Sequence, residues 1–496
     1  MLWLALFMLT GGPGDVPAPG VEIELSDGWA PRMLSEDHPY RPEFVRLADR
    51  PASEEERFLE LYGIPPSFTA VRARLLDEER HRCHAAVDAT PLTSEGEGAR
   101  AQVLAAQAHL RCDRLLAHEP DGQLDAATVA GLRSFQRSQA IIGASALDGE
   151  TRLALATSSR ELDFRTLLRV LRERVVDATG VIEDGSASRR GTVLGRRLDC
   201  SELRWTDRLP ALPGGAPDLV SRLTEQAARA LGWTDPEAAV AYFRDRWSPA
   251  TASRVRLPLD PAPLYHGPEM VLRAQIVTGG RRPELRLITR PPGTQGAADV
   301  VLVRWPTTKG GWQAEKTGPT SVALKMKPSA MGSFVWRDLI AAPAWFPPDT
   351  TPDEELVRKT GQGFRLNREV IGPGYRSAYG LVMLIHHRPP PLIEEGESPP
   401  VLYDAQTRTH GTANVRSVLH GDSHGCHRLY SALAVRLATF LLEHRRSVRR
   451  GTLVAHYRRI VSWQGRRMAL RADNRGYLYE LTPPVPVRVS VRPAQP

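Results

Sequence analysis

The chain has 496 residues, which is too long for one compact core and suggests about three domains. Hydrophobic residues make up 42% of it and charged residues 25%, a balance that excludes a largely disordered chain, a collagen-like fibre and a small disulfide-dense scaffold. The net charge of +8 favours polyanionic partners such as anionic lipid, nucleic acid or bacterial wall polymers. No arginine-rich run resembles a nucleic-acid-binding arm, so we expect no nucleic-acid partner.

Residues 1–20 look like a targeting segment. An apolar run from Leu2 to Leu9 is followed by small and helix-breaking residues. The run is too short to span a bilayer, and no later stretch approaches the ~20 apolar residues that a span needs. A secretory signal fits this length, although the usual positively charged start is missing. We therefore expect an exported protein without a membrane span; the alternative is a frayed terminus or a misplaced start.

Residues 21–98 read as an N-terminal helical region followed by a linker. Ser53 and Glu56 fit a capping box, in which the two side chains satisfy free amides at a helix start. Two prolines at 65 and 66 interrupt the pattern, and a second helical run continues to Cys83. The composition of residues 89–98 is typical of a linker.

Residues 99–158 contain a short internal sequence repeat. The stretch from Leu124 to Thr128 recurs 23 residues later, from Leu147 to Thr151, and in each copy an Asp is placed to cap a new helix. With the apolar helix before them, these copies predict a bundle of three short helices. Residues 102–156 resemble the peptidoglycan-binding module of cell-wall hydrolases, through the motifs at 122–128, 132–136 and 147–151. The alternative is an unrelated helical bundle with Asp caps.

The rest of the chain divides into a helical stretch and a β-rich one. Residues 159–265 predict helices over 163–176 and 219–231, and a capping box over 234–237; they name no activity. After Pro258 the apolar period becomes two, which predicts strands within 266–460 and a C-terminal strand extension over 461–496. One prominent helix is expected from about His427 to His444. The predicted fold class is therefore α+β and multidomain, with a helical N-terminal half and a β-rich second half; the expected strands lie at 271–277, 285–289, 300–305, 333–336, 380–385, 452–457 and 485–491.

The densest chemistry surrounds Cys426. A free cysteine needs an activator, because its pKa near 8.5 leaves little thiolate at neutral pH. At the start of the expected helix, unpaired amides and the helix dipole favour the thiolate, and the amides near Gly425 and Cys426 are candidates for an oxyanion hole. His410, at a strand end sixteen residues upstream, is the candidate general base. Gly411 and Gly425 allow a substrate to approach the backbone closely.

This constellation resembles the L,D-transpeptidase (YkuD-like) catalytic domain, which pairs His-Gly-Thr with a downstream Ser-His-Gly-Cys-x-Arg. Here these motifs are His410 to Thr412 and Ser423 to Arg428. Further likeness lies at 344–348, 372–374 and 451–454, so the resemblance covers about 266–460. It implies a β-sandwich-like domain.

By this resemblance Cys426 is the nucleophile, His410 is the general base, and the backbone carbonyl of Gly411 orients the histidine. Three further residues shape the site, namely Ser423, His424 and Gly425. Arg428 supports the loop or meets substrate charge. The sequence departs from the family pattern at two places. The position after the cysteine, usually aliphatic in the family, is His427, and residues 388–406 form a long insertion.

The activity that the resemblance implies is an exported peptidoglycan L,D-transpeptidase, periplasmic or associated with the cell wall. Its thiol forms an acyl-enzyme with a tetrapeptide stem and transfers it to an acceptor amine. The implied partners are the stem peptides and glycan of peptidoglycan, no metal or organic cofactor is implied, and the oligomeric state is left open. The alternatives are an L,D-carboxypeptidase, in which water replaces the amine, and a non-catalytic wall-binding protein.

Other histidines and cysteines leave alternatives open. A zinc site is the rival interpretation, since five His and Cys residues crowd the stretch from His410 to His427, but their spacing is unlike that of zinc sites. The pair at 386–387 reads as structural, and the arginines at 445–450 read as a solvated helix end. In an oxidising compartment we predict a disulfide between Cys83 and Cys112, with Cys200 buried and unpaired; buried free thiols are the alternative.

Overall fold

A computed structural model describes most of the chain. The described residues are 20–34, 37–41, 67–94, 96–139, 141, 146–187, 212, 214–248, 254–257, 259, 270–280, 282–290, 298–318, 321–361, 363–374, 376–389 and 402–492. Four predictions therefore fall wholly or largely outside the described residues: the signal-like segment, the capping box at Ser53, the state of Cys200 and the structure of the insertion at 388–406.

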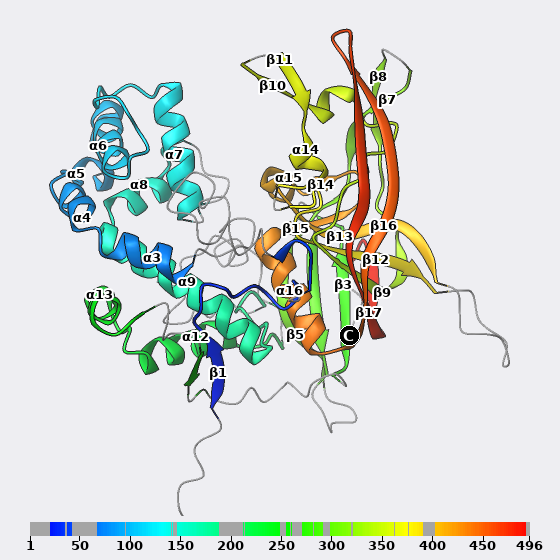
Figure 1. Ribbon diagram of the computed structural model, residues 1–496, viewed down its shortest axis with the longest axis horizontal. Coiled ribbons are helices and arrows are strands. Elements are labelled where there is room, and N and C mark those ends of the chain that lie inside the picture. Colours follow the sequence, from blue (N-terminus) through cyan, green and yellow to red (C-terminus); the bar gives the residue numbers. More distant parts are fainter. Residues whose placement is uncertain are drawn as a thin grey trace, which may run out of the picture.

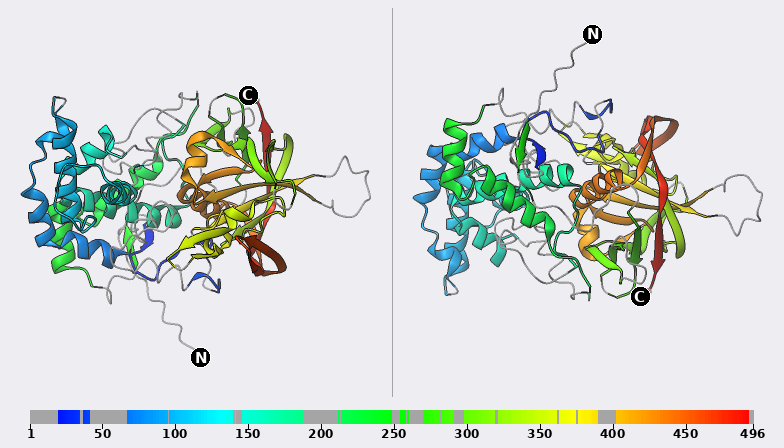
Figure 2. Two further views of the ribbon diagram at one scale, coloured as in Figure 1. Left: turned by 90° about the horizontal axis from the view of Figure 1, so that it is seen from above. Right: turned by 90° about the horizontal axis from the view of Figure 1, so that it is seen from below.

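The protein has a helical half and a β-rich half that lie side by side (Figures 1 and 2), so the expected mixed α+β class is confirmed. Helix α16 (Ser431–Glu443) of the β-rich half faces helix α9 (Ser159–Thr179) of the helical half. Arg436 on α16 forms an ion pair with Glu173 on α9 (3.0 Å), and His444 Nε2 donates to the Gly180 carbonyl (2.8 Å). None of the helices in the described residues is both long and apolar enough to cross a membrane.

The helical half is organised around α9, which the sequence predicted over 163–176 and which runs from Ser159 to Thr179. Apolar side chains of α3, α9, α12 and α13 form one buried core with the short β1–β2 ribbon. Its elements are β1 (Val21–Glu24), α3 (Phe68–Leu75), α4 (Glu78–Ala85), α5 (Thr90–Thr93), α6 (Ala99–Cys112), α7 (Ala126–Ser138), α8 (Gly149–Ala156), α9, α12 (Leu219–Ala230), α13 (Pro236–Asp245) and β2 (Arg254–Leu257).

The repeated motif forms two capped helices, as predicted. Asp125 accepts the Thr128 amide at the start of α7 (2.7 Å), and Asp148 accepts the Thr151 amide at the start of α8 (2.9 Å). Together with α6 these helices enclose a small separate core. The third cap differs from its prediction, because α13 is capped by the side chain of Asp235 and not by the threonine before it.

The disulfide between Cys83 and Cys112 is present, with the Cα atoms 5.6 Å apart. Cys83 lies in the last turn of α4 and Cys112 ends α6. The bridge therefore fixes the N-terminal helices to the three-helix bundle, as the sequence predicted.

The β-rich half is built on one nine-stranded mixed sheet, with strand order β15-β13-β12-β9-β17-β3-β4-β5 and β16 paired to β17. Helix α16 packs on β12, β13 and β15. The elements are β3 (Leu272–Val277), β4 (Glu284–Thr289), β5 (Val300–Pro306), β6 (Lys309–Gly310), β7 (Trp312–Lys316), β8 (Val322–Met326), β9 (Gly332–Ala341), η2 (Asp353–Leu356), β10 (Val357–Thr360), β11 (Gly363–Leu366), α14 (Arg368–Ile371), β12 (Val382–Arg388), β13 (Tyr403–Thr412), α15 (Val415–His420), β14 (Asp422–Ser423), β15 (His427–Tyr430), α16 (Ser431–Glu443), β16 (Arg446–Trp463) and β17 (Arg466–Ser490).

Three expectations about the end of the chain need correction. The prominent helix begins at Ser431, because residues 427–430 form strand β15 and pair with β13. Arg446 to Arg450 belong to strand β16 and not to a helix end. The part expected as a C-terminal extension supplies β17, which lies between β9 and β3 in the middle of the sheet.

Candidate functional site

Two neighbouring strands bring the motif residues together. Strands β13 and β15 are parallel, and His410 on β13 pairs with Arg428 on β15. Side chains two residues apart on a strand share a face, so Cys426, directly before β15, lies on the same face as Arg428 and His410. The cysteine and histidine named from the sequence therefore lie on one face at the edge of the sheet.

The predicted activation of Cys426 by a helix start is wrong. Four strand residues separate Cys426 from α16, and a helix dipole acts only within its first turn. The thiol is free of any disulfide and half-buried. Burial raises its pKa, which outweighs the opposing effects of the Arg408 backbone amide and of the Arg408 and Arg428 guanidinium groups. The resting thiol is therefore protonated at neutral pH.

His410 is held in one orientation. Its Nδ1 donates to the carbonyl oxygen of Gly411 (2.5 Å), which is the contact that the resemblance implied, and this leaves Nε2 as the basic nitrogen. The Tyr379 ring meets the imidazole edge to face, with the centroids 4.7 Å apart. Burial and the nearby Arg428 lower the pKa of His410 to about 3. The imidazole is therefore neutral and able to accept a proton.

The loop that carries Cys426 is clamped by residues 307–311. Thr308 Oγ1 donates to the Cys426 carbonyl (2.8 Å) and accepts the Arg428 amide (2.9 Å). Thr307 Oγ1 donates to the Arg428 carbonyl (2.8 Å). Ser423 Oγ lies 2.5 Å from the Cys426 carbonyl oxygen. These bonds fix the backbone on both sides of the thiol before any substrate arrives.

The two motif glycines also have roles in packing and in the conformation of the loop. A Cβ on Gly411 would lie 2.9 Å from Ser431 Oγ, so this glycine makes room for the start of α16 and not for substrate. Gly425 has φ of +107°, a conformation that glycine adopts easily, and it shapes the loop. Its amide donates to Ser423 Oγ (3.1 Å). Of the two amides proposed for an oxyanion hole, the one on Gly425 is thus already occupied.

Several residues of the site were missed in the sequence. Arg408 shares its face of β13 with His410 and holds Asp404 in a two-pronged ion pair (2.6 and 2.7 Å). Tyr379 is half-buried beside Cys426, and its pKa rises to about 12 through desolvation and the neighbouring thiol. Arg475 of β17 lies in electrostatic range of both Tyr379 and Arg408. The alternation of β13 could have revealed Arg408, but no local signal marks the other two.

The remaining histidines are divided between separate places. His427 lies on the opposite face of β15, fully buried, with Nδ1 donating to the Thr308 carbonyl (2.9 Å) and its ring 5.5 Å from that of His386. His386 bonds Thr409, while His387 bonds Asp338 (3.0 Å), so the 386–387 pair is structural. His424 is exposed, and burial of part of its ring together with Arg428 lowers its pKa. In the described part of the chain, no group of three or more His, Cys, Asp or Glu is placed to hold a metal ion.

Searches of protein-family models, of characterised proteins and of solved structures each returned no match to this chain. Any functional assignment therefore depends on the motifs and on the geometry around Cys426.

Proposed function

We propose that the protein is an exported peptidoglycan L,D-transpeptidase with its own wall-binding module, and that its catalytic domain is of the β-sandwich-like transpeptidase type. One observation supports this most strongly. Cys426 and His410 lie on one face of paired strands, and the Gly411 carbonyl holds His410 in the tautomer that a general base needs. The residues 99–158 are assigned to wall binding on their likeness in sequence alone.

The titration state of the pair determines how the reaction starts. Both groups are neutral at rest, because burial raises the pKa of Cys426 and lowers that of His410. A thiolate is therefore formed during the attack: the thiol proton passes to His410 Nε2 while the sulfur bonds to the carbonyl carbon of the third stem residue. The arginines at 408 and 428 stabilise the negative charge that develops, since both favour the anionic form of the neighbouring sulfur.

The second half of the reaction reverses the proton transfer. The tetrahedral intermediate collapses, the C–N bond breaks, and the departing D-alanine amine takes the proton from His410. A thioester on Cys426 remains. An acceptor amine then loses a proton to His410 as it attacks the thioester carbon, and the thiolate leaves and recovers the proton. Water in place of the amine gives the carboxypeptidase outcome.

Mass spectrometry of the purified chain incubated with a disaccharide-tetrapeptide tests the proposal. We expect an adduct equal to the donor minus D-alanine, located on the peptide that contains Cys426. Cys426→Ala should abolish the adduct, and His410→Gln should slow its formation by roughly 100-fold or more. The matched control is His420→Gln, an exposed histidine at the end of α15. An adduct that persists in Cys426→Ala would refute the proposal.

Product analysis separates the two enzymatic alternatives. With a tetrapeptide donor and an added amine acceptor, a transpeptidase gives a cross-linked dimer. A carboxypeptidase gives free tripeptide at every acceptor concentration. A chain that forms no adduct while binding insoluble peptidoglycan would be the non-catalytic wall-binding protein.

A further inference from the structure

Three β-hairpins extend toward one end of the β-rich half, at the top of Figure 1. They are β7–β8, β10–β11 and the tip joining β16 to β17, here called the hairpin end. Asp353 links two of them, by accepting from Lys316 of β7 (3.3 Å) and from Arg459 of β16 (2.7 Å). The ring of Phe364 on β11 lies against the ring of Trp463 on β16, with centroids 6.1 Å apart, and this contact joins the β10–β11 hairpin to the β16–β17 tip. Side-chain contacts therefore join the three hairpins to one another.

One face of the β7–β8 ribbon is apolar and exposed. Trp312 pairs with Met326, and Leu324 and Val322 follow on the same face at the alternate positions of β8. The exposed fractions are 68% for Trp312, 69% for Leu324, 51% for Val322 and 48% for Met326. On the opposite face Glu315 bonds Lys327 (2.6 Å) and Thr350 (3.0 Å), while Lys325 of β8 is exposed. Large apolar side chains gathered on one exposed face are unusual for a soluble surface and indicate an interaction site.

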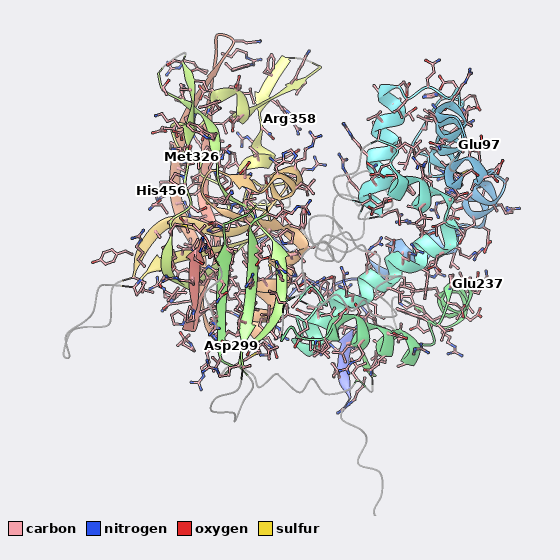
Figure 3. All side chains as sticks on the ribbon, turned by 180° about the vertical axis from the view of Figure 1, so that it is seen from behind. Glu97, Glu237, Asp299, Met326, Arg358 and His456 are labelled. Atoms are coloured by element: carbon pink, nitrogen blue, oxygen red, sulfur yellow. A yellow bond between two sulfur atoms is a disulfide. The ribbon has the colours of Figure 1, made fainter. Side chains whose placement is uncertain are left out.

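The hairpin end is also basic. Figure 3 labels Met326 and Arg358 on this end of the molecule. Three acidic side chains there are engaged: Glu315 with Lys327, Asp353 with Lys316 and Arg459, and Asp473 with Arg458, while Glu354 and Glu355 beside β10 are exposed. The exposed cations that remain come from all three hairpins and are Lys325, Lys359, Arg365, Arg466, Arg467 and Arg471.

We propose that the hairpin end docks on the surface of an anionic lipid bilayer, with the apolar face of β7–β8 in the interfacial layer and the surrounding cations on lipid phosphates. Apolar side chains flanked by Lys and Arg gain from both parts of such a surface. A wall polymer or a glycan supplies charge or a stacking face for Trp312, but it offers no apolar phase for Leu324, Val322 and Met326. Of these three partners, the bilayer alone offers an apolar phase beside anionic groups.

Docking would also place the Cys426 loop near the membrane. Strand β6, two residues before Trp312, pairs with β14, and the Gly311 amide donates to the Ser423 carbonyl (3.0 Å). The ribbon and the loop are thus directly joined. This consequence depends on the proposed function, but the docking itself does not.

Vesicle flotation of the full chain tests the proposal. We expect binding to vesicles of phosphatidylcholine with phosphatidylglycerol, little binding to phosphatidylcholine alone, and loss of binding in high salt. The double variant Trp312→Ser/Leu324→Ser should bind at least about tenfold more weakly. The matched control is Leu153→Ser/Tyr403→Ser, whose side chains are 59% and 60% exposed elsewhere on the molecule.

A second pair of variants separates charge from insertion. Arg466→Gln/Arg467→Gln should weaken binding to anionic vesicles by about thirtyfold, at roughly 1 kcal/mol for each of the two cations near such a surface. Arg133→Gln/Arg246→Gln, two exposed arginines of the helical half, should leave it unchanged. Circular dichroism checks that every variant is folded. Vesicle binding that neither test variant weakens would overturn the proposal. Test variants that lose binding to peptidoglycan but keep binding to vesicles would also overturn it, because the face would then bind glycan.

Discussion

Removing the Cys83–Cys112 disulfide should loosen the contact between α4 and the three-helix bundle. The bridge closes a loop with a sequence separation of 29 residues. In the chain-entropy model, opening a loop of that size returns about 12 cal/mol/K to the unfolded chain, or about 3.6 kcal/mol at 25 °C. Since a domain is stable by only about 5–15 kcal/mol, this region depends strongly on its bridge.

Hydrogen exchange measures the effect locally, which suits a chain of several cores. We expect amides of α4 and α6 to lose protection by two to three orders of magnitude in Cys83→Ala/Cys112→Ala, while amides of β12 and β13 are unchanged. Reduced wild-type protein is the matched control, because it opens the loop without changing side-chain volume. Equal protection in the oxidised and reduced proteins would refute the entropic argument, and a peptide map with both thiols free would refute the bridge.

Three further predictions concern titration and capping. Because burial raises the pKa of Cys426 above that of an ordinary thiol, its alkylation by iodoacetamide should keep accelerating through the alkaline range, and a plateau near neutral pH would contradict this. Asp148→Ala should lower the stability of the bundle by about 1 kcal/mol in thermal unfolding, whereas Asp148→Asn keeps a capping oxygen and should cost little. Burial, together with the neighbouring His84, lowers the pKa of His109 to about 4. Between about pH 6.5 and pH 4 the unfolded chain therefore binds a proton that the folded chain does not. Bundle stability should fall over that window in acid titrations, and His109→Gln should remove this part of the dependence.

Local signals in the sequence predicted much of the helical half. The caps at Asp125 and Asp148 need only a side chain three residues before the amide that it accepts, so the sequence repeat was sufficient to place them. A glutamine–threonine hydrogen bond that recurs between neighbouring helices could not be predicted from the sequence repeat. Gln107 on α6 donates to Thr128 (3.0 Å), and Gln136 on α7 donates to Thr151 (2.8 Å). These bonds depend on helix packing, which the pattern of one helix does not report.

The error at the start of α16 has a physical cause. Leu429, Leu433, Leu437 and Leu441 recur every four residues, so the helical period extends back through Leu429. Between His427 and Tyr430, however, buried side chains also recur at every second residue, at His427 and Leu429, which is the pattern of a strand. Strand β13 offers these residues a row of backbone hydrogen-bond partners. Strand pairing decides the outcome there, because β15 can satisfy its amides on β13 and still bury His427 and Leu429. A period of four alone cannot report pairing with a strand 18 residues earlier in the chain.

This difference of four residues changes the chemistry expected at the site. A thiol at a helix start is activated by the backbone, whereas a thiol beside strand β13 depends on its neighbours' side chains. Here the neighbours include Arg408 from β13, Arg428 from β15 and, next to Tyr379, Arg475 from β17. They still leave the pKa of Cys426 raised, because burial costs the thiolate more than the cations return. Arg408 is already paired with Asp404, so part of this positive charge is compensated at rest. The remainder favours an anion that arrives with the substrate or develops during attack, which is the use that a cysteine acyltransferase would make of it.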